Sequence, residues 1–200
     1  WDDAVRGASS WLHSGEQLYD AGIFIGYTRS ILEGMGGEGP GLDPASREIY
    51  EAWAECQHFS MYDDVPETLR RLHADGYRIG LISNTHRCLT SFQSHFALEG
   101  LISAAVSSSA HGYMKPHPSI FQSALTLVGA EPEASVMVGD SYAHDIEGAM
   151  ALGMRGILID RSRSASRLKS PHVPNRDNAT GKNFEACPVV SSLHELFDHL

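Results

Sequence analysis

Two aspartates spaced five positions apart are the residues of this chain whose types and spacing most suggest chemistry. Asp140 follows the apolar run VMVG at 136–139, and Asp145 lies in the first turn of a helix predicted over 142–153. Two neighbouring carboxylates repel each other unless a cation lies between them. Mg²⁺ accepts such oxygen ligands while it keeps several waters and substrate phosphate oxygens. The pair therefore indicates a Mg²⁺ site, and the alternative is that both acids only cap and decorate the start of the helix.

Two other segments carry groups that suit an anion. Ser83 and Asn84 end the run YRIGLISN, where a hydroxyl and a backbone N–H can donate to an anionic oxygen. The alternative is that they cap a helix predicted over 87–96. Lys115 stands before two prolines that fix the approach to a helix predicted over 117–129, so its point charge would lie near a helix N-terminus. Taken singly, it is an ordinary exposed lysine.

Alternating strands and helices would position these groups. The apolar patterns predict strands over 77–83, 101–107, 135–139 and 155–160, and helices over 63–76, 87–96, 117–129 and 142–153. Such alternation predicts parallel βαβ units and a doubly wound α/β sheet. Ligands of such sheets bind at the carboxyl ends of the strands, where all three segments fall.

The regions before and after the predicted strands and helices have different sequence patterns. Residues 1–58 show helical spacing, with a second helix over about 44–57 that would use Asp43 as its N-cap and Pro44 as its first residue. Residues 161–187 are polar and predict a solvated insertion, although a basic lip that attracts anionic substrates is an alternative. The last ten residues, SSLHELFDHL, predict a capped helix.

Together, these segments resemble motifs of a known enzyme family. LISN, KPHPSIF and VGDSYAHD resemble the second, third and fourth motifs of the haloacid dehalogenase-like (HAD) superfamily of hydrolases. The resemblance covers residues 62–160 closely. It implies a Rossmann-like α/β core over 62–200 and a small α-helical cap over 1–61.

The resemblance also implies a reaction and roles for the residues. In this family an aspartate attacks a phosphoryl group and forms an aspartyl-phosphate, which water hydrolyses. Ser83 and Lys115 would be catalytic: Ser83 would bind a phosphate oxygen with help from the backbone at Asn84, and Lys115 would stabilise the transferring charge. Asp140 would bind Mg²⁺, and Asp145 would orient metal, water or lysine. The implied substrate is a small phosphorylated metabolite.

One family motif has no match in the chain. The first motif is an apolar strand that ends in Asp-x-Asp, and neither Asp2-Asp3 nor Asp63-Asp64 follows a strand. The missing strand would lie centrally, so residues 79–82 and 135–138 should be neighbours with room for one strand between them. The expectation is a fragment of a longer enzyme, without phosphatase activity of its own.

Three readings of function remain open. The first is a Mg²⁺-dependent phosphatase that lacks its nucleophile here. A haloacid dehalogenase is the second, but its chemistry is metal-free, which the paired acids disfavour. The third is a non-catalytic binding or regulatory module of the same fold. His117 and His144 replace residues that are usual in the family, and their roles cannot be assigned from the sequence.

Composition restricts the possible binding partners and the cellular compartment. The net charge of −10 argues against non-specific nucleic-acid binding, and no apolar run is long enough to span a membrane. The three cysteines are widely spaced and form neither a disulfide framework nor a metal knuckle, so a reducing, cytoplasmic setting is expected. The sequence predicts no oligomeric state.

Overall fold

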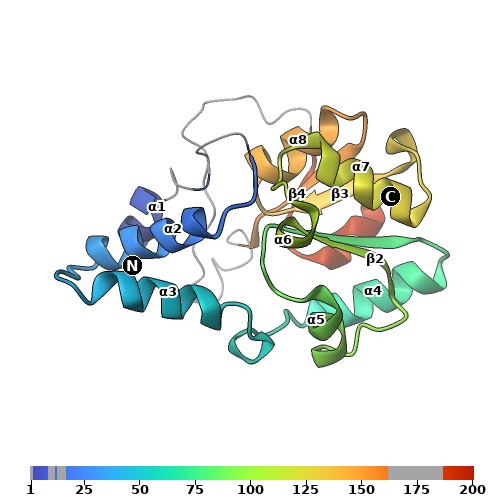
Figure 1. Ribbon diagram of the computed structural model, residues 1–200. Coiled ribbons are helices and arrows are strands. Elements are labelled where there is room, and N and C mark those ends of the chain that lie inside the picture. The colour runs from blue at the N-terminus through green and yellow to red at the C-terminus, as the bar shows by residue number, and fades with distance from the viewer. Residues whose placement is uncertain (1, 9–11, 13–16, 162–186) are drawn as a thin grey trace.

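The computed structural model describes residues 2–8, 12, 17–161 and 187–200. It shows a group of helices, α1 to α3, beside an α/β body that holds every strand (Figure 1). The α/β body follows the predicted alternation of strands and helices, and the predicted strand limits are correct to within two residues. The α/β fold class is therefore confirmed.

The helical group is built from three short helices. Helix α2 (Ala21–Gly34) lies between α1 (Asp2–Ala8) and α3 (Leu42–Ala52), and it buries Ile31 against two alanines of α1. The predicted end of the helix over 44–57 was wrong, because α3 ends at Ala52, and the predicted N-cap was wrong, because Gly41 caps the helix. Asp43 does not cap this helix, since its carboxylate pairs with Arg29 of α2. None of the described helices is long and apolar enough to cross a lipid bilayer.

The strands form two separate parallel sheets. In the first, β1 (Ile79–Ser83) pairs with β2 (Ile102–Ser107). In the second, β3 (Val136–Gly139) pairs with β4 (Arg155–Ile159), which pairs with β5 (Val189–Val190). The two-residue strand β5 was not predicted, because so short a run carries no periodic signal.

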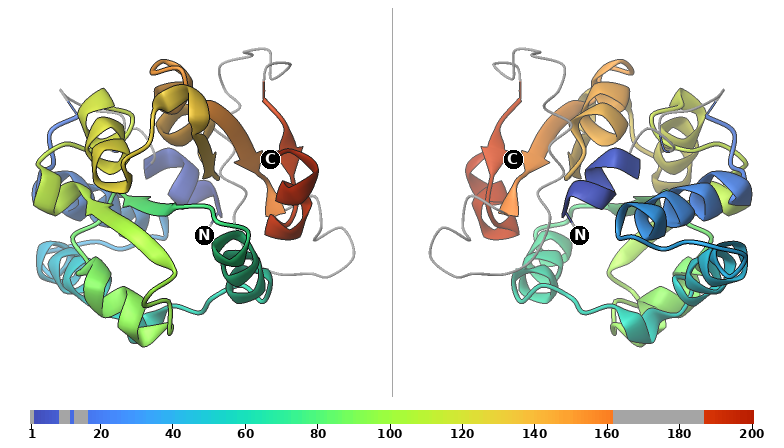
Figure 2. Two further views of the ribbon diagram at one scale, coloured as in Figure 1. Left: turned by 90° about the vertical axis from the view of Figure 1, so that its right-hand side faces the viewer. Right: turned by 90° about the vertical axis from the view of Figure 1, so that its left-hand side faces the viewer.

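Helices cover both faces of these sheets (Figure 2). On one face, α7 (Pro118–Val128) and α8 (Glu147–Met150) enclose a core that reaches both sheets, since Ile82 of β1 and Met137 of β3 pack against it. The other face is covered by α4 (Asp64–Ala74) and by the 3₁₀ helix η9 (Leu193–Asp198). This arrangement places the strands in a middle layer between helices, as expected for parallel sheets.

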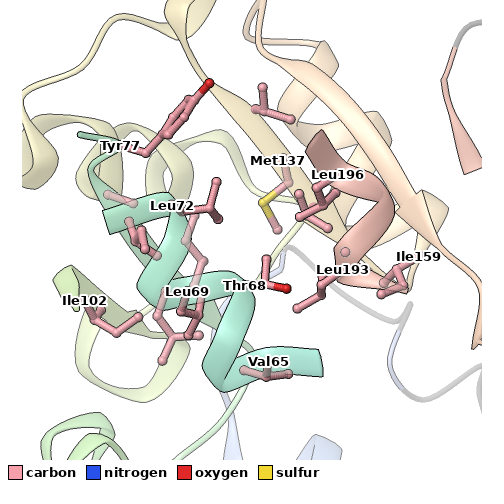
Figure 3. Close-up of a pocket in the computed structure, with 18 of the residues that line it drawn as sticks. Val65, Thr68, Leu69, Leu72, Tyr77, Ile102, Met137, Ile159, Leu193 and Leu196 are labelled. Carbon is pink, nitrogen blue, oxygen red and sulfur yellow. The ribbon is translucent and has the colours of Figure 1, made fainter. Parts of the chain in front are cut away.

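A groove separates the two sheets. Strands β1 and β3 do not pair with each other, yet residues 79–82 and 136–139 line the same cavity of about 1100 Å³ (Figure 3). The two strands therefore border one cavity without pairing, as expected, and room for one strand between them stays a prediction.

Two predicted helices differ in form from the structure. The segment 142–153 begins as a π-helical turn (Tyr142–Ile146) and continues as α8, because the Ser141 carbonyl accepts from the N–H groups of both Asp145 and Ile146. The C-terminal segment is the 3₁₀ helix η9 (Leu193–Asp198) instead of an α-helix, capped by the Ser192 side chain. The predicted polar insertion lies outside the described residues except at its two ends.

Candidate active site

A buried ion pair stands at the carboxyl ends of β1 and β3. The Lys115 Nζ atom lies 2.5 Å from Asp145 Oδ1, and the two side chains are 12% and 4% exposed. The same ammonium donates to the Ile82 carbonyl oxygen of β1 at 3.3 Å. Lys115 therefore contacts both the end of β1 and an aspartate that follows β3, as predicted from the position of these segments at the carboxyl ends of the strands.

Asn84 fixes the lysine-bearing segment through its side chain. Its Nδ2 donates to the Lys115 carbonyl oxygen at 3.0 Å, and the Lys115 N–H donates to its Oδ1 at 2.7 Å. Asn84 does not cap the next helix, because α5 (Leu89–His95) begins later, with Cys88 at its N-cap. The two reciprocal bonds hold the lysine backbone in place without using the ammonium group.

Ser83 lies next to this cluster. It is the last residue of β1, faces Ser107 across the β1–β2 pair, and is half-buried. The Lys115 ammonium donates to the carbonyl oxygen of Ile82, the residue immediately before Ser83 in β1. The structure thus brings Ser83, Asn84 and Lys115 to one edge of the α/β body.

The two aspartates differ in environment. Asp145 uses both carboxylate oxygens, since Oδ1 binds Lys115 and Oδ2 accepts from the Ser141 N–H at 3.0 Å. Asp140 is exposed where β3 ends and lines the groove. Within the described part of the chain, no three His, Cys, Asp or Glu side chains form a metal cluster. An exposed carboxylate such as that of Asp140 suits Mg²⁺, which is often held by one or two protein carboxylates with waters and phosphate.

Gly139 explains how Asp145 reaches its place, and the sequence patterns did not single it out. A Cβ atom added to Gly139 would collide with the Cβ, the carboxyl carbon and an oxygen of Asp145. The aspartate therefore packs directly against the backbone at the end of β3. The only signal for this contact in the sequence is a glycine immediately before Asp140.

Replacing Gly139 by alanine should displace the Asp145 carboxylate and weaken its bond to Lys115. Since the new methyl group meets a buried side chain at the strand end, we expect a loss of about 1–3 kcal/mol in the free energy of unfolding. Urea denaturation measures it. Gly7, where an added Cβ meets nothing, is the matched control, and equal losses for the two variants would contradict the contact.

An aromatic contact joins the helical group to the loop after β1. The His86 ring stacks on Tyr50 of α3 with centroids 3.9 Å apart, and the Tyr50 hydroxyl lies 2.5 Å from that of Tyr19. Burial lowers the pKa of His86, which favours the neutral imidazole. Sequence analysis missed these residues because their spacing carries no motif.

The two unassigned histidines have local roles. His117 is the N-cap of α7, where its Nδ1 accepts from the Ser119 N–H at 3.2 Å, and its ring stacks on Tyr113. His144 Nδ1 lies 2.9 Å from the Ser141 hydroxyl. Both contacts shape the turns that carry the lysine and the aspartates.

Comparisons with known proteins agree with this geometry. A family model described as haloacid dehalogenase-like hydrolase matches residues 31–159. The human haloacid dehalogenase-like hydrolase domain-containing protein 3 is 33% identical over 131 residues, which are 66% of this chain and 52% of that protein. Pyrophosphatase PpaX of Bacillus cereus strain AH820 is 28% identical over 134 residues, 66% of this chain and 61% of that protein. This chain therefore spans little more than half the length of these relatives.

A solved structure shows the same fold. The HAD phosphatase from Thermococcus onnurineus superposes with a TM-score of 0.63 and 20% identity, over 98% of this chain and 86% of that one. At this identity the likeness concerns the fold alone, whereas the family model matches more than half of the sequence. The chain belongs to the haloacid dehalogenase-like hydrolase family.

Proposed function

We propose that this chain forms the phosphate-binding and metal-binding part of a phosphohydrolase site that acts on a small phosphorylated metabolite. The observation that carries the proposal is the buried Lys115, which is held by Asp145, Ile82 and Asn84 where two parallel strands end. A fixed cation at this edge is suited to the charge that spreads over a transferring phosphoryl group. The pyrophosphatase and phosphatase among its relatives support this class of substrate.

Each residue has a distinct task in this proposal. The Ser83 hydroxyl and the backbone N–H of Asn84 would donate to phosphate oxygens, and Lys115 would neutralise the developing charge. Asp140 would hold Mg²⁺, which would neutralise phosphate charge when bound. Asp145 would orient the lysine, because both of its oxygens already accept hydrogen bonds within the protein.

The proposal assigns no nucleophile to these 200 residues. No apolar strand ending in Asp-x-Asp occurs in the sequence, so we expect the chain to bind phosphate without hydrolysing phosphoesters. A non-catalytic binding module would bind phosphate equally, whereas a haloacid dehalogenase would need no Mg²⁺. Residues 1–61 would act as the helical cap over the core at 62–200, with Tyr50 and His86 at their contact.

Phosphate binding tests the proposal directly. Calorimetric titration of the 200-residue chain with orthophosphate should detect Mg²⁺-dependent binding that chelation of the metal abolishes. Replacing Ser83 by alanine should weaken binding by about ten- to a hundredfold, the value of one hydrogen bond to an anion. Ser135→Ala, at the opposite end of β3, is the matched control, because its hydroxyl only donates to the Glu131 carbonyl. Unchanged affinity in Ser83→Ala, or turnover of p-nitrophenyl phosphate by the unmodified chain, would contradict the proposal.

A further inference from the structure

We propose that Cys56 and Cys88 form a reversible disulfide when the protein meets a peroxide, and that this bond fixes the connection between the helical group and the α/β body. The two cysteines are 32 positions apart in the sequence. In the fold, their segments meet around one cation, Arg87. The proposal concerns a modification site and does not depend on phosphate chemistry.

Arg87 joins the segment between α3 and α4 to the start of α5. Its guanidinium donates to the Trp53 carbonyl oxygen at 2.6 Å, and its central carbon lies 3.8 Å from the ring centroid of Phe59. Both of these partners flank η2 (Cys56–His58), a 3₁₀ turn that packs against α5 (Figure 1). Cys88 follows Arg87 directly and is the N-cap of α5. The two cysteines therefore lie on the two segments that meet at this guanidinium.

The guanidinium also interacts with the sulfur of Cys56. Burial lowers the pKa of Arg87, and the negative charge that Cys56 carries when ionised opposes this effect. Among the residues that the structure describes, none accepts a hydrogen bond from the buried Nε of Arg87. An anionic sulfur at Cys56 could accept this bond. Arg87 would therefore attract the sulfur anion that attacks when a disulfide forms.

Cys88 is the thiol that a peroxide would reach first. It is exposed, whereas Cys56 is half-buried. Hydrogen bonding by the Ser91 hydroxyl, and by the N–H groups of Ser91 and Thr90, lowers the pKa of the Cys88 thiol. Peroxides oxidise accessible thiols with a lowered pKa, because the thiolate is the nucleophile. Both its exposure and its acidity therefore suit Cys88 to the first oxidation step.

Two steps complete the disulfide. The Cys88 thiolate attacks one oxygen of the peroxide, the O–O bond breaks, and a sulfenic acid forms while hydroxide leaves. The Cys56 thiolate then attacks the Cys88 sulfur, so that the S–S bond forms and the S–O bond breaks with loss of a second hydroxide. Each hydroxide takes up the proton that one thiol has released. In total, two thiols and one H₂O₂ give one disulfide and two waters, and the two sulfurs supply the two electrons that reduce the peroxide.

The segment around Cys56 can move toward Cys88. The turn η2 is short and contains no buried residue. Segments with few buried contacts shift at a low cost in free energy. The bond would tie this segment to the loop after β1, which also carries Asn84. It would thereby restrict movement of the helical group relative to the α/β body.

Peroxide treatment of the full 200-residue chain tests the proposal. The reduced protein is freed of reductant and mixed with a molar excess of hydrogen peroxide, its remaining thiols are blocked, and its digest is analysed by mass spectrometry. A peptide that joins Cys56 to Cys88 should form in most molecules, and dithiothreitol should remove it. The midpoint of thermal unfolding should rise by about 5–10 °C on oxidation, because the bond closes a long loop in the unfolded chain.

Three serine variants provide the controls. Cys56→Ser and Cys88→Ser should each lose both the joined peptide and the rise in the unfolding midpoint. Cys187→Ser should keep both, because Cys187 is buried and burial raises the pKa of its thiol.

Three results would overturn the proposal. The first is a parent chain in which no peptide joins Cys56 to Cys88, whether Cys88 stays reduced or is oxidised to a sulfinic acid. The second is a Cys88–Cys88 bond between two copies as the main product, which would mean that the exposed thiol pairs between molecules. The third is a bond to Cys187 in comparable yield, which would mean that oxidation follows unfolding. All three are measured on the parent chain, so none depends on whether a serine variant folds.

Discussion

Replacing Lys115 by methionine should lower the free energy of unfolding by about 3–5 kcal/mol and abolish phosphate binding. The size of the effect comes from the partner that remains, because Asp145 is only 4% exposed and would be left in a buried site without its cation. The backbone bonds to Asn84 would survive, so the segment would keep its path. Urea denaturation at neutral pH measures the loss.

A double variant separates this charge effect from packing. In Lys115→Met combined with Asp145→Leu no buried charge remains, so much of the lost stability should return. Arg29→Met serves as a surface control, since Arg29 pairs with Glu33 where both side chains are nearly half exposed, and little change is expected. A Lys115→Met protein as stable as the parent would show that the pair is not buried in solution.

Replacing Asp64 by alanine should cost about 3 kcal/mol, the second large effect. Its carboxylate accepts from both terminal nitrogens of Arg161 at 2.8 and 3.0 Å, and from the Ser192 hydroxyl and the Leu193 N–H at 2.8 Å each. These contacts connect α4 to the end of β4 and to η9. Chemical denaturation would show the loss, and Asp63→Ala, an exposed neighbour whose side chain caps nothing, is the control.

The same carboxylate should make stability depend on acid. Burial alone would raise the pKa of Asp64, but the hydrogen bonds from Arg161, Leu193 and Ser192 outweigh burial and lower it below 3.8. The native state therefore binds this proton more weakly than the unfolded chain. The stabilisation is complete above the unfolded pKa and disappears as the pH falls through the folded one.

Asp64→Asn isolates this contribution. The free energy of unfolding, measured at steps of pH from about 2 to 6, should fall less steeply in acid than it does for the parent chain. Asp63→Asn should reproduce the parent slope. If the Asp64→Asn slope also matched that of the parent, the hydrogen bonds around Asp64 would not stabilise its charged form over its protonated form.

Local patterns predicted four of the described strands, all except β5, because apolar runs, prolines and glycines act within a few residues. The sequence also predicted that Ser83, Lys115 and the two aspartates meet at one edge of the sheet, because the carboxyl ends of parallel strands lie together. Contacts between distant residues did not follow. The Asn84 side chain binds the backbone of a residue 31 positions away, and Asp145 and Lys115 are 30 positions apart. These contacts depend on how α7 and its neighbours pack against one face of both sheets, which brings together residues far apart in the chain.

Other differences have equally local causes. Asp43 looked like an N-cap before Pro44, but Arg29 on the facing helix competes for its carboxylate. The first residue of the basic loop, Arg161, was expected to be solvated with the rest. It instead binds Asp64 and lies 3.9 Å from the ring centroid of Tyr62. Both outcomes depend on neighbours that a one-dimensional pattern does not contain.

The division of the sheet also governs how cooperatively this molecule unfolds. Within the described residues the β1–β2 pair shares no backbone ladder with the β3–β4–β5 sheet. The contacts that hold these two sheets together are therefore made by side chains. These are the apolar layer around Phe121, the Lys115–Asp145 pair and the carboxylate of Asp64. Melting of one half can therefore precede the other, and the side chains that join them set the energetic coupling between two folding units.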